Sequence, residues 1–142
     1  MTFVDNNGIR INYEVEGDPG NLALVMQHGT SADLNSWRDR GFTARLGDKY
    51  RLVLIDGRGA GLSDKPRDVE AYSGPHRASD VIAVLDDLGI ERAHFFGYSM
   101  GGLIGAAVLR YHSERLLGIV LGGYNPYFPR SVATPPATQA EF

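Results

Sequence analysis

Residues 95–102, with the sequence Phe-Phe-Gly-Tyr-Ser-Met-Gly-Gly, constrain the fold of this chain more than any other segment. An apolar stretch of strand length runs into a Gly-x-Ser-x-Gly pattern, and the small and apolar residues after it predict a helix. A strand-to-helix turn this tight accepts only glycine two residues before and two residues after the serine, and it strains the backbone of the serine. The pattern therefore predicts that Ser99 projects its hydroxyl from a sharp turn.

The residue after the serine has a predicted role of its own. The backbone N–H of Met100 would lie at the N-terminus of the new helix, where unpaired donors and the helix dipole favour a developing oxyanion. Gly-Ser clusters also form ordinary loops, because both residues favour turns in any protein. The pattern gains its specificity from its position between an apolar strand and an apolar helix.

Two further segments consist of an apolar strand that ends in a polar turn. Residues 22–27 end in the sequence His-Gly-Thr-Ser at 28–31, and residues 51–55 end in Asp-Gly-Arg-Gly-Ala-Gly-Leu-Ser-Asp at 56–64. Together with the turn at Ser99, these motifs resemble the α/β-hydrolase superfamily, and its small serine esterases in particular. The resemblance covers nearly the whole chain.

The resemblance implies roles for the residues around Ser99. The N–H of Thr30 would be the second oxyanion donor beside that of Met100, and Gly29 would let this backbone approach the reacting carbonyl. Tyr98 would be either a pocket wall or a core residue. The implied reaction is acyl transfer to water, in which Ser99 attacks an ester or amide carbonyl of a small molecule and the acyl-enzyme is then hydrolysed. A serine in place of an aspartate argues against dehalogenase or epoxide-hydrolase chemistry.

The remaining segments predict strands that alternate with helices. Strands are expected at residues 3–5, 9–16, 22–27, 51–55, 94–98 and 117–121, and helices from residue 35 or 36 to 46, at 75–88 and at 100–111. This order predicts an α/β fold with a mostly parallel sheet and helices on both faces. In terms of the resemblance it is an α/β-hydrolase core that lacks the last strands of the family's sheet. The expected organisation is a core domain at 1–126 and an irregular tail, rich in Pro, Thr and Ala, at 127–142.

Composition excludes several classes of function. The 142 residues contain no cysteine, which excludes disulfides, thiolate catalysis and cysteine metal sites. The net charge of −3, without a basic stripe, predicts no nucleic-acid partner. No apolar stretch is long enough to span a membrane and the first residues do not resemble a signal peptide, so we expect a cytoplasmic protein. No metal or organic cofactor is implied.

A general base for Ser99 is the component that the sequence does not provide. In this superfamily the acid and the histidine follow the serine in chain order, but His112 is the one histidine after Ser99. It lies at the end of the predicted helix, more than about 15 Å from Ser99 at 1.5 Å per residue. His28 is expected to hold the oxyanion loop by hydrogen bonds. We therefore expect a serine hydrolase that is impaired, because both the acid and the histidine base are absent.

Other polar and aromatic residues near the motifs have structural explanations. Asp56 and Arg58 are expected to fix their loop by hydrogen bonds. Trp37 is expected to pack beneath the oxyanion loop rather than to bind a ligand. Phe95 and Phe96 are expected to be strand residues that the flanking helices cover.

Two alternative functions do not require catalysis. The chain is then either a non-catalytic member that retains the serine turn as a binding pocket, or an interaction protein. The second alternative follows from the last predicted strand, which would leave unpaired backbone groups and apolar side chains at the edge of the sheet. This edge, from Leu117 to Gly122, predicts a homodimer that forms by strand pairing.

Overall fold

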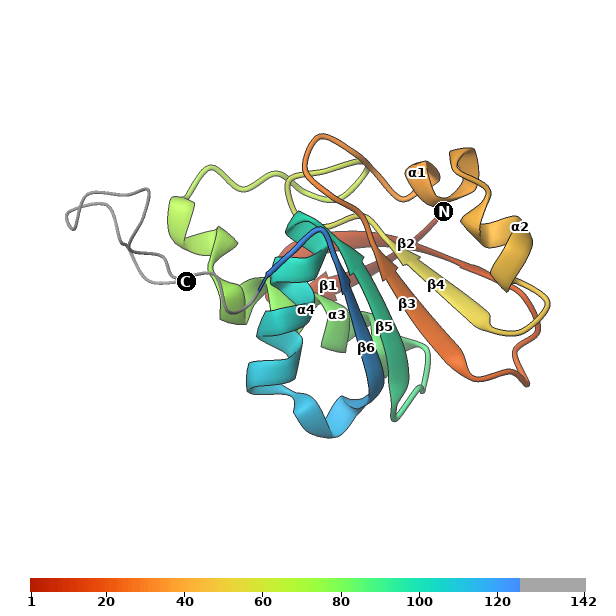
Figure 1. Cartoon of the computed structure of the whole chain (residues 1–142). Helices are drawn as coiled ribbons and strands as arrows, with labels where there is room; N and C mark the ends of the chain where they lie inside the picture. The colour runs from red at the N-terminus through yellow and green to blue at the C-terminus, as the bar shows by residue number, and fades with distance from the viewer. Residues whose placement is uncertain (126–142) are drawn as a thin grey trace.

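The computed structural model describes residues 1–125, so the predicted tail at 127–142 lies outside the described residues. Six strands form one sheet: β1 (Thr2–Asn6), β2 (Ile9–Glu16), β3 (Ala23–Gln27), β4 (Arg51–Ile55), β5 (Ala93–Tyr98) and β6 (Leu116–Gly122). The helices are α1 (Asn35–Asp39), α2 (Phe42–Leu46), α3 (Gly74–Asp87) and α4 (Met100–Tyr111), with short 3-10 turns η1 (Val69–Tyr72) and η2 (Ser113–Arg115). Figure 1 shows their arrangement.

The sheet is mostly parallel, as the sequence predicts. Its strand order is β1-β2-β4-β3-β5-β6, in which β3, β4, β5 and β6 pair in parallel and the β1–β2 hairpin joins β4 in antiparallel orientation. Asn7 and Gly8 connect the hairpin with positive φ angles of 54° and 82°. These are the angles that a two-residue turn of type I′ requires, which explains the Asn-Gly sequence.

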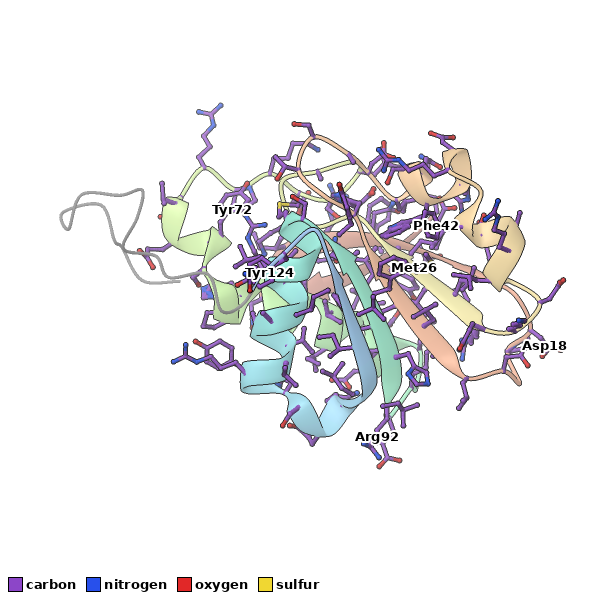
Figure 2. The ribbon with its side chains drawn as sticks, in the orientation of Figure 1. Asp18, Met26, Phe42, Tyr72, Arg92 and Tyr124 are labelled. Carbon is purple, nitrogen blue, oxygen red and sulfur yellow. The ribbon has the colours of Figure 1, made fainter. Side chains whose placement is uncertain are left out.

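Side chains alternate between the two faces of the sheet, and each face has its own apolar core. Alternate residues of the central strands, such as Val25 and Val53, pack with the buried sides of α3 and α4. Their neighbours Met26 and Leu54 pack on the opposite face with Trp37 and the residues around α2. Figure 2 shows Met26 and Phe42 together on this second side. The helices therefore cover both faces, as expected.

The expected single helix from residue 35 to residue 46 is wrong, because the structure has two short helices there. Gly41 lies between α1 and α2 with a φ of 74°, and its N–H donates to the carbonyl oxygen of Arg38 at 2.8 Å. This left-handed conformation ends α1 in the manner of a glycine C-terminal cap. The chain then turns so that Phe42 faces the sheet, where its ring meets the ring of Trp37 at 5.2 Å.

The predicted boundaries of α3 and α4 agree with the structure within one residue. Pro75 lies in the first turn of α3, and Gly89 follows the helix with a φ of 65°. No helix among residues 1–125 is both long enough and apolar enough to cross a membrane.

Candidate active site

Ser99 has the strained backbone that the sequence predicts. It lies between β5 and α4 with φ 53° and ψ −111°, a conformation that residues other than glycine rarely adopt. Two hydrogen bonds hold it there: its N–H donates to the carbonyl oxygen of Gly122 at 2.7 Å, and its own carbonyl accepts from Leu103 at 3.1 Å. The end of β6 and the first turn of α4 thus fix the turn from both sides.

The two glycines of the motif are required by close backbone contacts. A Cβ atom on Gly97 would lie 2.0 Å from the carbonyl oxygen of Gly101, and a Cβ on Gly101 would lie 2.1 Å from that of Gln27. Both distances are far below any van der Waals contact, so neither position accepts alanine without movement of the backbone. The prediction of glycine on steric grounds is therefore confirmed.

The loop after β3 lies against this turn. A Cβ on Gly29 would lie 3.3 Å from the carbonyl oxygen of Tyr98 and 3.4 Å from the Cβ of Ser99, so the loop approaches the serine closely. Thr30, the next residue, is exposed, and Ser31 turns the chain with a positive φ of 59°. Among the described residues, no protein group accepts a hydrogen bond from the N–H of Thr30 or from that of Met100.

His28 holds the loop, and both nitrogens of its ring are engaged. The backbone N–H of Gly57 donates to Nε2 at 3.1 Å, which makes Nε2 an acceptor. Nδ1 therefore carries the proton and donates to the carbonyl oxygen of Gly29 at 2.8 Å. The ring is 1% exposed. This neutral, fully bonded imidazole acts as a structural link between two loops, as expected, and has no free nitrogen with which to deprotonate Ser99.

Asp56 organises the same region from the end of β4. Its buried carboxylate accepts hydrogen bonds from the backbone N–H of Leu34 at 2.8 Å, the N–H of Leu62 at 2.9 Å and the side-chain amide of Asn12 at 2.9 Å. Three elements of the chain thus meet at one carboxylate. The expected role in loop fixation is confirmed.

Arg58 forms a buried ion pair that the sequence analysis did not identify. Its guanidinium binds both carboxylate oxygens of Asp80 in α3, at 2.6 and 2.7 Å, and the amide of Asn6 donates to the same carboxylate at 2.8 Å. Nearby, burial and the positive charge of Arg58 lower the pKa of Arg77. The Gly-rich turn after β4 is therefore anchored to α3 by charge-assisted hydrogen bonds.

A cavity of about 300 Å³ lies beside the serine turn, and Gly29 and Tyr98 are in its wall. Tyr98 is 51% exposed, so it forms a pocket wall and is not a core residue. Trp37 is buried against Phe42 and Phe96, and it lines this cavity together with Gly29. Phe96 is half-buried: its ring packs against Trp37 of α1 and Phe42 of α2, as expected of a strand residue covered by helices, and it lines the cavity as well.

Arg40 and Phe42 also line the cavity, and the sequence analysis did not predict either residue. Both follow Trp37 closely, and the position of Gly41 between two helices brings them to the same wall. The sequence pattern predicts one continuous helix here, and in such a helix residues 40 and 42 would lie on different faces. Their position on one cavity wall could therefore not be predicted from the pattern.

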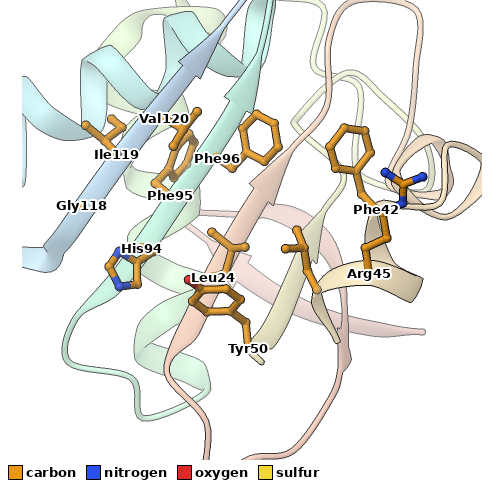
Figure 3. A pocket seen from close by; sticks show the side chains of 11 residues that line it. Leu24, Phe42, Arg45, Tyr50, His94, Phe95, Phe96, Gly118, Ile119 and Val120 are labelled. Atoms are coloured by element: carbon orange, nitrogen blue, oxygen red, sulfur yellow. The ribbon is translucent and has the colours of Figure 1, made fainter. Parts of the chain in front are cut away.

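A second hollow lies on the same face of the sheet, over the β5–β6 side. It is an apolar groove of about 530 Å³, and Figure 3 shows Phe42 and Phe96 near one end and Tyr50 and His94 near the other. Val120 of β6, in the wall of this groove, is 58% exposed. Neither Ser99 nor Gly29 lines the groove, but Phe42 and Phe96 line both hollows, so the groove adjoins the cavity beside the serine.

No histidine of residues 1–125 forms a hydrogen bond with Ser99, and its Oγ atom has no protein partner there. His112 lies at the far end of α4, as predicted, and is 3.8 Å from the carboxylate of Glu114. His94 begins β5 at the opposite end of the strand from Ser99. Residues 1–125 contain no group of three or more His, Asp or Glu side chains that could hold a metal ion.

The fold and this arrangement at the serine turn correspond to a known family. Residues 23–138 match the family described as the alpha/beta hydrolase fold, and the chain belongs to this family.

Three relatives illustrate the range of the family. Epoxide hydrolase A of Mycobacterium tuberculosis is 32% identical over 138 residues, which are 97% of this chain and 42% of that protein. The 3-oxoadipate enol-lactonase 2 of Acinetobacter baylyi is 34% identical over 113 residues, which are 80% of this chain and 41% of that protein. The structure of Est816, an N-acyl homoserine lactone degrading enzyme, is 35% identical with a TM-score of 0.75, over 83% of this chain and 43% of that one. The chain therefore spans less than half the length of each relative.

Proposed function

We propose that the chain carries the nucleophile and the oxyanion hole of a serine hydrolase that acts on an ester, lactone or amide carbonyl. The observation that carries the proposal is the strained turn at Ser99, which lies in contact with the glycine loop and beside a cavity. An elbow of this kind exposes the serine hydroxyl next to unpaired backbone donors. The N–H groups of Thr30 and Met100, which have no protein acceptor among residues 1–125, are the proposed donors.

The reaction would follow the acyl-enzyme route. Oγ of Ser99 attacks the carbonyl carbon, the carbonyl electrons move to the oxygen, and the two N–H groups stabilise the resulting oxyanion. The tetrahedral intermediate then expels the alcohol or amine, and water hydrolyses the acyl-enzyme in a second step. A lactone is a cyclic ester, so the two lactone-cleaving relatives are consistent with this chemistry. The serine at position 99 is the reason to favour this route over epoxide opening.

The proposal includes slow turnover by the 142-residue chain alone. The proton of Ser99 needs an acceptor, and His28 is fully engaged while His112 lies at the other end of α4. Without a base, the oxyanion hole and substrate binding alone give about 10³ to 10⁴ over the rate in water.

Labelling with a fluorophosphonate probe tests the proposal, because the probe forms a covalent bond only with a nucleophilic serine. We expect weak but specific labelling that Ser99→Ala abolishes. The matched control is Ser113→Ala, which removes an exposed serine of η2 and should leave labelling unchanged. No labelling, or labelling that survives Ser99→Ala, would contradict the proposal and favour a non-catalytic binding role.

A second proposal concerns self-association and has its own observation. Among the described strands β6 is at the edge of the sheet, and the apolar groove of Figure 3 runs along its face. Leu117 and Val120, on this strand, are 40% and 58% exposed. Edge strands with exposed apolar side chains pair readily with another strand. We therefore propose that two copies of this chain associate through residues 117–122.

A further inference from the structure

Aromatic side chains form much of the wall of the cavity beside Tyr98, and two of the lining residues, Trp37 and Arg40, have hydrogen-bond donors without acceptors among residues 1–125. The first is Nε1 of Trp37, a residue that is only 4% exposed. This nitrogen is buried and has no hydrogen-bond partner among the described residues. A buried N–H without an acceptor is rare in folded proteins, because its desolvation is not compensated. A ligand in the cavity that offers an oxygen acceptor would compensate it.

The second donor is the guanidinium of Arg40 at the cavity wall. Within residues 1–125 it forms no ion pair and no hydrogen bond. Arg38, two residues earlier, instead binds Glu14 at 2.6 Å and Glu16 at 2.5 Å. Arg38 thus binds both glutamates of β2, and the guanidinium of Arg40 keeps its five N–H donors available.

The charges around Arg40 do not neutralise it. Asp33, Asp39 and Lys65 line a neighbouring hollow together with Arg40, and neither carboxylate lies within 4.0 Å of the guanidinium. The carboxylate of Asp33 instead accepts a hydrogen bond from the backbone N–H of Asn35, two residues later, at 2.8 Å.

We propose that this cavity receives the acyl chain of the substrate, and that Arg40 and Trp37 select acyl chains that end in a carboxylate. The inference rests on the proposed hydrolase function and specifies its substrate class: half-esters of short dicarboxylic acids, or lactones whose acyl chain carries a further carboxylate. The aromatic rings of Phe42 and Phe96 would pack against the methylene groups, while the guanidinium and the indole N–H bind the terminal carboxylate. The carbonyl end of the chain would then lie toward Gly29 and Ser99.

A binding experiment tests the inference without any need for catalysis. The chain contains one tryptophan, so a ¹H–¹⁵N correlation spectrum has one indole signal, that of Trp37. We titrate the protein with glutarate and, as the matched acid without a second carboxylate, with butyrate. We expect glutarate to shift the indole signal downfield and to bind about fivefold to tenfold more tightly than butyrate.

Two arginine variants assign this selectivity to its position. Arg40→Gln should remove the preference for glutarate, whereas Arg45→Gln should keep it. Arg45 is the matched control because it is another exposed arginine of the same segment that forms no ion pair within residues 1–125, and it lines the adjoining groove but not the cavity. The fold of each variant is checked by circular dichroism, and Arg40→Lys, which retains the charge, should keep part of the preference.

Two results would overturn the inference. The first is an indole signal that responds equally to both acids or to neither. The second is an equal loss of the preference for glutarate in Arg40→Gln and in Arg45→Gln, which would indicate general charge attraction. Failure of fluorophosphonate labelling with intact glutarate selectivity would refute the hydrolase proposal alone, and the reverse result would refute the carboxylate subsite alone.

Discussion

At the scale of single residues, steric exclusion determines the geometry of the serine turn. Ser99 is held at a positive φ because the backbones of Gly97, Gly101 and Gln27 pack within distances that admit no side chain. Backbone strain of this kind persists only where the surrounding structure determines it fully. The glycines therefore determine the geometry of the serine turn, although they contribute no chemical group.

Gly101→Ala tests this conclusion. The added Cβ would lie 2.1 Å from the carbonyl oxygen of Gln27, so β3 and α4 must separate. We expect a loss of about 3 kcal/mol or more in the free energy of unfolding, measured by denaturant titration, together with loss of fluorophosphonate labelling. The matched control is Gly74→Ala in the first turn of α3, where the nearest atom is 3.6 Å away and φ is not positive; it should change stability by less than about 0.5 kcal/mol. An unchanged Gly101→Ala protein would contradict the steric argument.

The sequence predicts some of these residues and not others, for a physical reason. The positions of Ser99 and its glycines follow from local backbone requirements, which a short motif expresses completely. Arg40 could not be identified in this way, because its availability depends on Arg38, which binds the glutamates of a distant strand. The ion pair of Arg58 with Asp80 likewise joins segments 22 residues apart, and no pattern within either segment specifies it.

At the scale of secondary-structure elements, one side-chain contact links the hairpin to the main helix. The phenol of Tyr13 in β2 donates a short hydrogen bond to the carboxylate of Asp87 at the end of α3. Burial and this contact raise the pKa of Tyr13 from 10.0 to about 12. The neutral phenol is thus favoured in the folded state.

This shift predicts a loss of stability at high pH. Between about pH 10 and pH 12 the unfolded chain releases the phenol proton while the folded chain retains it, so the unfolded state binds fewer protons and stability falls as the pH rises. The stabilisation is fully present below about pH 10. We expect the difference in unfolding free energy between the unmodified chain and Tyr13→Phe to decrease across this window.

Asp87→Asn separates the two causes of the shift. It removes the charge of the acceptor but leaves the burial of Tyr13, which is the larger cause, so part of the pH dependence should remain. Tyrosinate absorbance during a pH titration gives an independent measurement of the pKa. A Tyr13→Phe variant with the same pH profile as the unmodified chain would show that the contact has no such effect.

Element boundaries were predictable where a local signal ends the element. Gly89 ends α3 and the Asn-Gly pair forms the hairpin turn, both with the positive φ angles that these residues favour. The break between α1 and α2 was missed because Gly41 also fits the interior of a helix at moderate cost. Its left-handed conformation places the ring of Phe42 against Trp37 and Phe96, contacts that no local pattern contains.

At the scale of the whole molecule, the β6 edge is the surface on which the self-association proposal depends. Val120→Lys places a charge on this strand, where the side chain is 58% exposed, and should disrupt pairing without changing the fold. We expect sedimentation velocity at micromolar concentration to show a dimer for the unmodified chain and a monomer for Val120→Lys. Leu109→Lys on α4, where the leucine is 46% exposed, is the matched control and should remain dimeric. A monomer at every concentration would refute the proposal.

The central position of β3 has a consequence for the order in which the chain is made. All five of its residues, from Ala23 to Gln27, are buried, yet its partner strands begin only at Arg51 and Ala93. During synthesis from the N-terminus, this apolar strand therefore leaves the ribosome well before either neighbour exists. Parallel pairing over such separations is slow, and an unpaired apolar strand readily joins other chains. The yield of native protein should thus depend on the time between the synthesis of β3 and that of β5. Slower translation between residues 28 and 93 should increase aggregation.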